Sequence, residues 1–76
     1  MEASKSKKAR KQLGRKIRKL RTEQKISQEQ LAFESGLVRQ EISYLESGLK
    51  NATLDTLLSV AEALDVHVKE LLNFEY

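Results

Sequence analysis

Apolar residues recur at the period of an α-helix along most of this 76-residue chain, and this period constrains the fold more than any other feature. Residues 13–20 and 38–45 each place apolar side chains at i, i+4 and i+7, which is one face of a helix. Residues 54–64 predict a wider apolar face, made by Leu54, Leu57, Leu58, Ala61 and Leu64. No segment shows the alternation of a half-buried strand, so the sequence predicts an all-α fold.

Helix boundaries follow from the polar and glycine residues between these segments. Ser27 lies three residues before Gln30, the spacing of a capping box in which each side chain bonds the other's backbone N–H. Gly36 and Gly48 predict the ends of two short helices, because glycine adopts positive φ without a Cβ penalty. Thr53 predicts the N-cap of the next helix, and a short last helix follows. The sequence therefore predicts one compact five-helix domain.

The N-terminal segment is predicted in two parts. Residues 1–8 are small, polar and charged, and we expect a basic, disordered arm there. The helical pattern begins near Ala9, so residues 9–76 form the expected domain. Gly14 lies inside the first helix and should weaken it by roughly 1 kcal/mol relative to alanine.

Charge is distributed unevenly along the chain. Residues 1–25 hold eleven of the fourteen Lys and Arg residues and carry a net charge of +9, whereas residues 26–76 carry −6. A basic arm on an acidic body is common in proteins that bind phosphate groups. The alternative is a solvated tail that exerts only a general attraction.

Composition argues against several classes of site. The chain has no Cys, which excludes disulfides and thiolate metal sites, and His67 is its single histidine. We therefore expect no metal and no cofactor. No apolar run approaches the roughly 18 residues needed to cross a membrane. Ser27, Ser43 and Asp55 suggest no nucleophile–base arrangement, so we expect that the protein is not an enzyme.

Residues 27–48 have the pattern of a helix-turn-helix, two short helices joined by a turn that contains Gly36. The polar face of the second helix presents Arg39, Gln40, Ser43 and Tyr44. Arginine can bond guanine O6 and N7 together, and glutamine can bond adenine N6 and N7. Because the N-terminal residues of such a helix meet the base edges, these four residues are predicted to read double-stranded DNA. The alternative is a solvated helix face, with Tyr44 packed as a half-buried aromatic residue.

The segment SQEQLAFESGLVRQEISYLESG, followed by ATLDTLLSVAEALDV, resembles the Cro/CI-type family of phage repressors, also called the XRE family. The resemblance covers about residues 13–73 and is strong, since the pattern is long and its spacing is tight. The agreeing positions are Gln28, Leu31-Ala32, Gly36, Ile42-Ser43, Glu46, Gly48, Thr53-Leu54, Leu57, Ala61, Ala63-Leu64 and Leu71-Leu72. The resemblance implies the compact five-helix fold of lambda-repressor type.

The resemblance also implies roles for individual residues. Gln28 matches a glutamine that bonds a DNA phosphate and braces the first recognition residue. Lys50 and Asn51 lie in the loop that usually grips phosphate. Arg21 and Glu46 match an ion pair that joins the first and third helices and orients them more than it stabilises them.

Four residues depart from the family pattern. Val38 stands where a Ser or Thr cap is frequent, which predicts a looser start of the recognition helix. Ala52 replaces a common proline, and Asp65 replaces a frequent helix-ending glycine. Glu41 would repel phosphate if it pointed outward, so we expect it to face sideways, toward the second helix or a cytosine N4.

The C-terminal segment carries more apolar residues than so short a helix needs for the core of one small domain. The resemblance implies a dimer interface there, with the candidates Val68, Leu71, Leu72, Phe74 and Tyr76. The alternative is packing within the chain. A two-fold dimer would place two recognition helices about 34 Å apart, one turn of duplex.

The predicted function is therefore a dimeric, sequence-specific regulator of transcription on a palindromic operator, encoded by a bacterium or phage and located in the cytoplasm at the nucleoid. Lacking an effector domain, it would act by occlusion or by contacting RNA polymerase. The resemblance suits a restriction–modification controller protein and a small phage or plasmid repressor equally. The alternatives are a protein-interaction module such as an antitoxin, and sequence-indifferent binding of nucleic acid by the basic arm.

Overall fold

The computed structural model describes residues 2–75, and within this range the only regular elements are five α-helices. They are α1 (Glu2–Glu23), α2 (Gln28–Ser35), α3 (Arg39–Ser47), α4 (Leu54–Ala63) and α5 (Val68–Leu71). The predicted all-α class and the five helices are confirmed. None of these helices combines the length and the apolar character that crossing a membrane requires.

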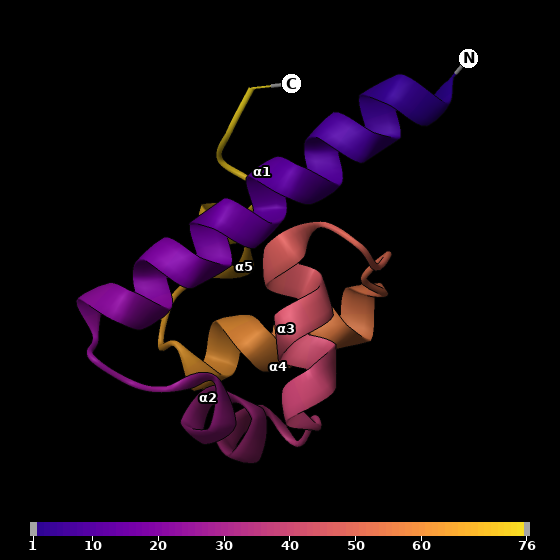
Figure 1. The fold of residues 1–76 in the computed structure, drawn as a ribbon. Coiled ribbons are helices and arrows are strands. Elements are labelled where there is room, and N and C mark those ends of the chain that lie inside the picture. The colour runs from indigo at the N-terminus through magenta and orange to yellow at the C-terminus, as the bar shows by residue number, and fades with distance from the viewer. Residues whose placement is uncertain (1, 76) are drawn as a thin grey trace.

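The longest helix, α1, lies across the rest of the domain (Figure 1). It packs against α3 and α5, while α2 packs against α3 and α4, and α4 also packs against α5. The N-terminal half of α1 extends past the end of α3 and past the loop that follows it (Figure 1). This half therefore belongs to the surface of the domain more than to its core.

The start of α1 differs from the prediction, because the helix includes residues 2–8, where the sequence predicts a disordered arm. This segment holds no Gly or Pro, and its Lys and Ala residues favour helix. A helix already nucleated by the buried residues Leu13 and Ile17 is extended at low cost. Arg10 Nη1 also donates to Ser6 Oγ at 2.8 Å, one turn earlier. Met1 lies outside the described residues.

The core draws side chains from all five helices. Its buried members are Leu13, Ile17, Leu31, Ala32, Ile42, Leu45, Leu57, Val60, Ala61, Leu64 and Leu71. The wide apolar face predicted for residues 54–64 is wrong at two positions, because Leu54 and Leu58 are 65% and 47% exposed. Val60, which the prediction left out, is fully buried. The buried face of α4 is therefore rotated from the predicted one, and two leucines stay on the surface.

Gly14 marks the point at which α1 crosses the last turn of α3. A Cβ at this position would lie 2.4 Å from the carbonyl oxygens of both Leu45 and Glu46, closer than real Cβ atoms approach. The two backbones meet this closely because glycine has no side chain. The residue that lowers the helix propensity of α1 is thus the one that lets α1 touch α3.

The turns on either side of α2 and α3 follow the sequence prediction. Gly36 ends α2 with φ 74° and Gly48 ends α3 with φ 77°, both left-handed. Ser27 Oγ accepts the N–H of Gln30 at 3.0 Å, which is one half of the predicted capping box. The Gln30 side chain instead donates to Glu34 Oε2 at 2.6 Å.

The ends of α4 are also capped by side chains. Thr53 Oγ1 accepts the N–H of Thr56 at 3.1 Å, which confirms the predicted N-cap. After α4, Asp65 takes a φ of 58°, the left-handed conformation that a glycine adopts more readily. Gln24 Nε2 donates to the carbonyl oxygen of Leu64 at 2.7 Å, so the segment after α1 ties down the end of α4.

Candidate nucleic-acid interface

Helix α3 has one face in the core and one face in solvent. The buried face consists of Ile42, Leu45 and Glu46. The exposed face carries three of the predicted base-reading residues, Arg39, Gln40 and Tyr44, while Ser43 is half-buried at its edge. The residues of α3 that were predicted to read bases therefore lie on its solvent-facing side or at the edge of that side.

Two of these side chains are joined. Gln40 Nε2 donates to the Tyr44 hydroxyl oxygen at 2.8 Å, one helical turn away, so the amide and the phenol form a single polar ridge. Arg39 has no hydrogen-bond or ion-pair partner among residues 2–75, and its guanidinium is free to bond a ligand. An arginine at the first turn beside an amide is the chemistry that reads guanine and adenine edges.

Glu46 anchors α3 from below through a buried polar network. Arg21 Nε donates to Glu46 Oε2 at 2.6 Å, and Arg21 Nη2 donates to Glu46 Oε1 at 3.1 Å, a bidentate ion pair. The side chains of Arg21 and Glu46 are only 11% and 4% exposed. Arg21 Nη1 also donates to the carbonyl oxygen of Ile26 at 2.8 Å. The pair that the resemblance implies therefore exists, and it fixes α1 and the segment before α2 against α3.

Gln28 joins the same network at the first position of α2. Its Nε2 donates to Glu46 Oε1 at 3.0 Å, so its amide nitrogen is committed inward. The side chain is half-buried between α2 and α3. Its predicted contact with a DNA phosphate remains a prediction, whereas its part in aligning the two helices is visible.

The expectation that Glu41 faces sideways, toward α2 or a base, is wrong. Its Oε1 accepts the backbone N–H of Val38 at 3.1 Å, and its Oε2 lies 3.3 Å from Lys50 Nζ. These contacts hold the pKa of Glu41 below its ordinary value, first through the hydrogen bond from Val38 and then through Lys50. Glu41 thus supplies the reciprocal half of a capping box, in which its carboxylate accepts the Val38 N–H, while the Val38 side chain has no acceptor for the other half. The glutamate three residues after the cap position was the sequence signal for this role.

The loop between α3 and α4 contains the predicted phosphate-binding residues Lys50 and Asn51, and both are exposed. Lys50 is paired with Glu41, and Asn51 Oδ1 accepts from Arg10 Nη1 at 3.5 Å. Arg10 Nε also donates to the carbonyl oxygen of Gly48 at 3.4 Å. Arg10 was not among the predicted site residues, because nothing in its local pattern distinguishes it from the other basic residues of α1.

The predicted C-terminal dimer patch is only partly exposed. Leu71 is fully buried, so it fills the core of its own chain and is not available to a partner. Val68 and Phe74 are half-buried against the core, and Leu72 is 48% exposed. Tyr76 lies outside the described residues. The prediction of Leu71 as an interface residue is corrected, because α5 needs it for packing on α1 and α4.

Other exposed apolar side chains were not foreseen as surface residues. They are Phe33, Val38, Leu49, Leu54 and Leu58, of which the last two lie one turn apart on α4. The apolar stripe predicted for residues 38–45 is therefore wrong at Val38, which is 60% exposed. Exposed leucines at i and i+4 form an apolar strip of the kind that a partner covers. Among the described residues, no group of three or more His, Cys, Asp or Glu side chains gathers as metal ligands would.

Comparison with known proteins agrees with this geometry. The family model described as Helix-turn-helix matches residues 17–71. Control protein C.BamHI of Bacillus amyloliquefaciens is 44% identical over 62 residues, covering 80% of this chain and 76% of that protein. Control protein C.SmaI of Serratia marcescens is 43% identical over 60 residues, covering 79% and 71%.

The fold is likewise similar to a solved structure. The crystal structure of the restriction-modification controller protein C.AhdI from Aeromonas hydrophila matches with a TM-score of 0.81 and 42% identity, covering 82% of this chain and 94% of that one. The relatives are helix-turn-helix proteins, and the exposed polar face of α3 above the buried Arg21–Glu46 pair has the geometry of that motif. The chain belongs to the helix-turn-helix family, of the Cro/CI or XRE type that its sequence resembles.

Proposed function

We propose that this protein is a sequence-specific regulator of transcription that binds double-stranded DNA with α3 in the major groove. The observation that carries the proposal is the exposed row of Arg39, Gln40 and Tyr44 on a helix held in place by the buried Arg21–Glu46 pair. A helix with an unpaired arginine and an exposed amide at its first turn is suited to direct readout of base edges. Each good bidentate contact supplies about 1–3 kcal/mol of discrimination between bases.

The phosphates on either side of the groove would be held by residues at the two ends of the motif. Gln28 stands at the N-terminus of α2, where backbone N–H groups attract anions. Lys50 and Asn51 stand in the loop after α3. In the complex, Lys50 would exchange Glu41 for a phosphate oxygen, since their pairing is exposed and therefore weak.

We propose that the protein acts as a homodimer on a palindromic operator. The exposed leucines of α4, Leu54 and Leu58, together with Leu72, form the contact surface in this proposal. Leu54 and Leu58 take the place of Leu71, Val68 and Phe74, which pack within the chain, and only Leu72 is kept from the C-terminal candidates. Two-fold symmetry would place two copies of α3 about 34 Å apart, which matches one turn of B-form DNA.

The relatives named control proteins suggest the regulatory setting. We propose that this chain is likewise a controller protein of a restriction–modification system, acting in the cytoplasm at the nucleoid and without catalysis. It would regulate a promoter by occupying it or by contacting RNA polymerase from an adjacent site.

Selection from random duplex DNA tests this function. The purified protein is expected to enrich two inverted half-sites with centres about 10 base pairs apart. Arg39→Ala with Gln40→Ala should abolish the enrichment while leaving the melting temperature unchanged, because both side chains are exposed. Lys69→Ala with Asn73→Ala is the matched control, since it removes one exposed cation and one exposed amide from α5 and the segment after it, outside the helix-turn-helix. Enrichment that survives the first double substitution would refute the assignment of α3 as the reading helix.

A further inference from the structure

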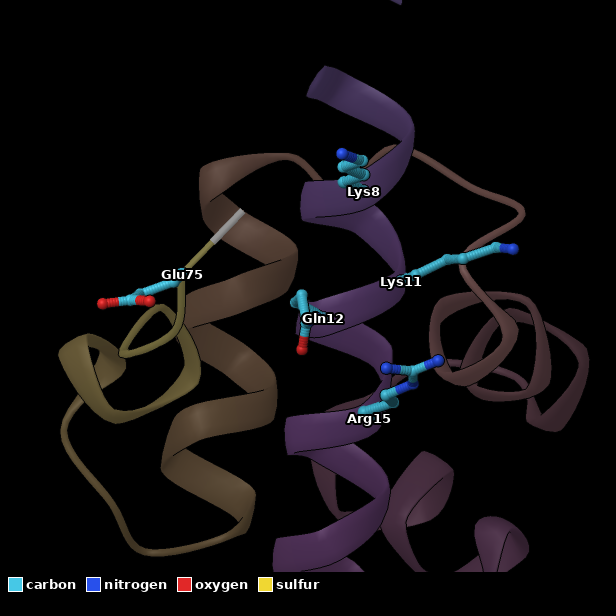
Figure 2. Close-up of a pocket in the computed structure, with 5 residues that line it drawn as sticks. All are labelled: Lys8, Lys11, Gln12, Arg15 and Glu75. Atoms are coloured by element: carbon cyan, nitrogen blue, oxygen red, sulfur yellow. The ribbon is translucent and has the colours of Figure 1, made fainter. Parts of the chain in front are cut away.

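Helix α1 carries a concentration of cations that the recognition surface does not use. An open surface hollow of about 480 Å³ is lined by Lys8, Lys11, Gln12, Arg15 and Glu75. We call Lys8, Lys11, Gln12 and Arg15 the α1 basic cluster. The Glu75 carboxylate points away from these four residues (Figure 2). Three cations, one amide and one acid therefore line the hollow, and the cations outnumber the acid.

The α1 basic cluster lies beside the loop that follows α3. A Cβ built on Gly48 would come within 2.9 Å of Lys11 Cγ, so Lys11 packs over the end of α3. One residue earlier, Arg10 bonds the Gly48 carbonyl oxygen and Asn51 Oδ1. These contacts fix α1 against the loop that carries Lys50. Lys11 and Arg10 of α1 thus place further positive charge beside the loop that carries Lys50.

The cations of the cluster form no ion pair among residues 5–75, whose side chains the structure describes. The salt bridges within this range are Arg21–Glu46 and Lys50–Glu41, and neither involves the cluster. Lys8 and Lys11 are three residues apart and Lys11 and Arg15 four, spacings at which like charges on a helix repel one another. A surface of this kind attracts polyanions and releases their counterions when it binds them.

We propose that the α1 basic cluster binds the phosphates of DNA that flank the half-site read by α3. This inference rests on the proposed function, and it names a contact outside the helix-turn-helix itself. The eight residues from Lys8 to Arg15 span about 11 Å of helix. At 3.4 Å per base pair this length corresponds to about three base pairs of flanking duplex for each protomer.

The test compares two triple variants on two duplexes over a series of salt concentrations. The first variant is Lys8→Gln, Lys11→Gln and Arg15→Gln; the control is Lys16→Gln, Lys19→Gln and Lys69→Gln, which removes the same charge elsewhere on α1 and α5. Glutamine has nearly the helix propensity of lysine and arginine, so α1 should persist, and circular dichroism verifies this. One duplex carries flanks of about ten base pairs around the selected operator, and the other ends at the half-sites.

The cluster variant is expected to lose salt dependence on the flanked duplex. The slope of log K against log salt should fall by about 0.9 for each lost phosphate contact, hence by up to about 2.7 per protomer. Trimming the flanks should weaken the wild-type protein and the control variant but leave the cluster variant unchanged. The bases selected by all three proteins should be identical, because the cluster touches phosphates only.

Three results would overturn the inference. One is a cluster variant that loses as much affinity on the trimmed duplex as on the flanked one, and another is a loss no greater than that of the control. A third is full DNA affinity combined with a loss of self-association by light scattering, which would assign the cluster to the acidic body of a second copy. A wild-type protein that selects no sequence would instead refute the proposed function, and the flank contact would fall with it.

Discussion

Gly14→Ala separates two opposed physical expectations. Helix propensity alone predicts a gain of about 1 kcal/mol, because alanine is the better helix former. The structure predicts a loss, since the new Cβ would lie 2.4 Å from two backbone carbonyl oxygens of α3. To bring these contacts to 3.0 Å, α1 and α3 must separate by about 0.6 Å at their crossing. Overpacking of this kind typically costs about 1–3 kcal/mol, and rigid backbone atoms place the cost near the upper end.

The net expectation for Gly14→Ala is therefore a loss of about 1–2 kcal/mol. For a domain of this size, each kcal/mol lowers the melting temperature by about 4–8 °C, so thermal unfolding followed by circular dichroism resolves the effect. Lys19→Ala at an exposed position of the same helix is the control, and it should change stability by less than about 0.5 kcal/mol. A melting temperature that rises in Gly14→Ala would show that propensity outweighs the crossing and would refute the reasoning.

Three further perturbations follow from other contacts. Arg21→Ala leaves Glu46 as a buried charge without its partner and should cost about 3–5 kcal/mol in urea unfolding, whereas replacing both residues by Met and Leu should restore most of that loss. The pKa of Glu41 is lowered by folding, so its stabilising effect is complete above its ordinary pKa of 4.5 and disappears as pH falls through the lowered value of the folded state. Melts of the wild type and Glu41→Ala between about pH 7 and about pH 2 should accordingly converge at low pH; a constant difference would contradict the role of the charge. Leu54→Ser with Leu58→Ser should convert the proposed dimer to a monomer of unchanged helix content, and light scattering that still gives a dimer would place the interface elsewhere.

Local signals accounted for much of the fold. The residues at helix ends, Ser27, Gly36, Gly48 and Thr53, act through their own backbone conformation or through an N–H a few residues away, so their effect is readable in sequence. The face of α3 was also readable, because burial of Ile42 and its helical neighbours fixes which side is exposed.

Features that depend on distant contacts could not be predicted in the same way. Gly14 is needed because the backbone of α3, more than thirty residues away in the sequence, passes close to it. Helix propensity predicts only that this glycine weakens α1. Leu54 and Leu58 fit an apolar stripe equally well inside or outside the core, since periodicity does not say which edge of a wide stripe faces α2 and α5. Leu71 was assigned to a partner because of the family resemblance, although its own chain buries it completely.

The start of α1 shows a related limit. Composition predicted disorder for residues 1–8, because charged segments bury too little surface to fold alone. The segment does not fold alone, since it prolongs a helix that is already anchored at Leu13 and Ile17. Helix continuation is a property of the neighbouring turn and not of the segment's own composition.

The Glu46 network separates two properties that a DNA-reading protein must combine. The carboxylate of Glu46, on the buried face of α3, accepts hydrogen bonds from Arg21 of α1 and Gln28 of α2. The angles between these helices are therefore set on the buried side of the helix-turn-helix. Arg39 and Gln40 stand on the opposite side and contribute nothing to those angles. Substitutions at these two positions can therefore change the base sequence that is recognised without altering the angles between the helices. The DNA target of the protein can thus diverge while its fold is retained.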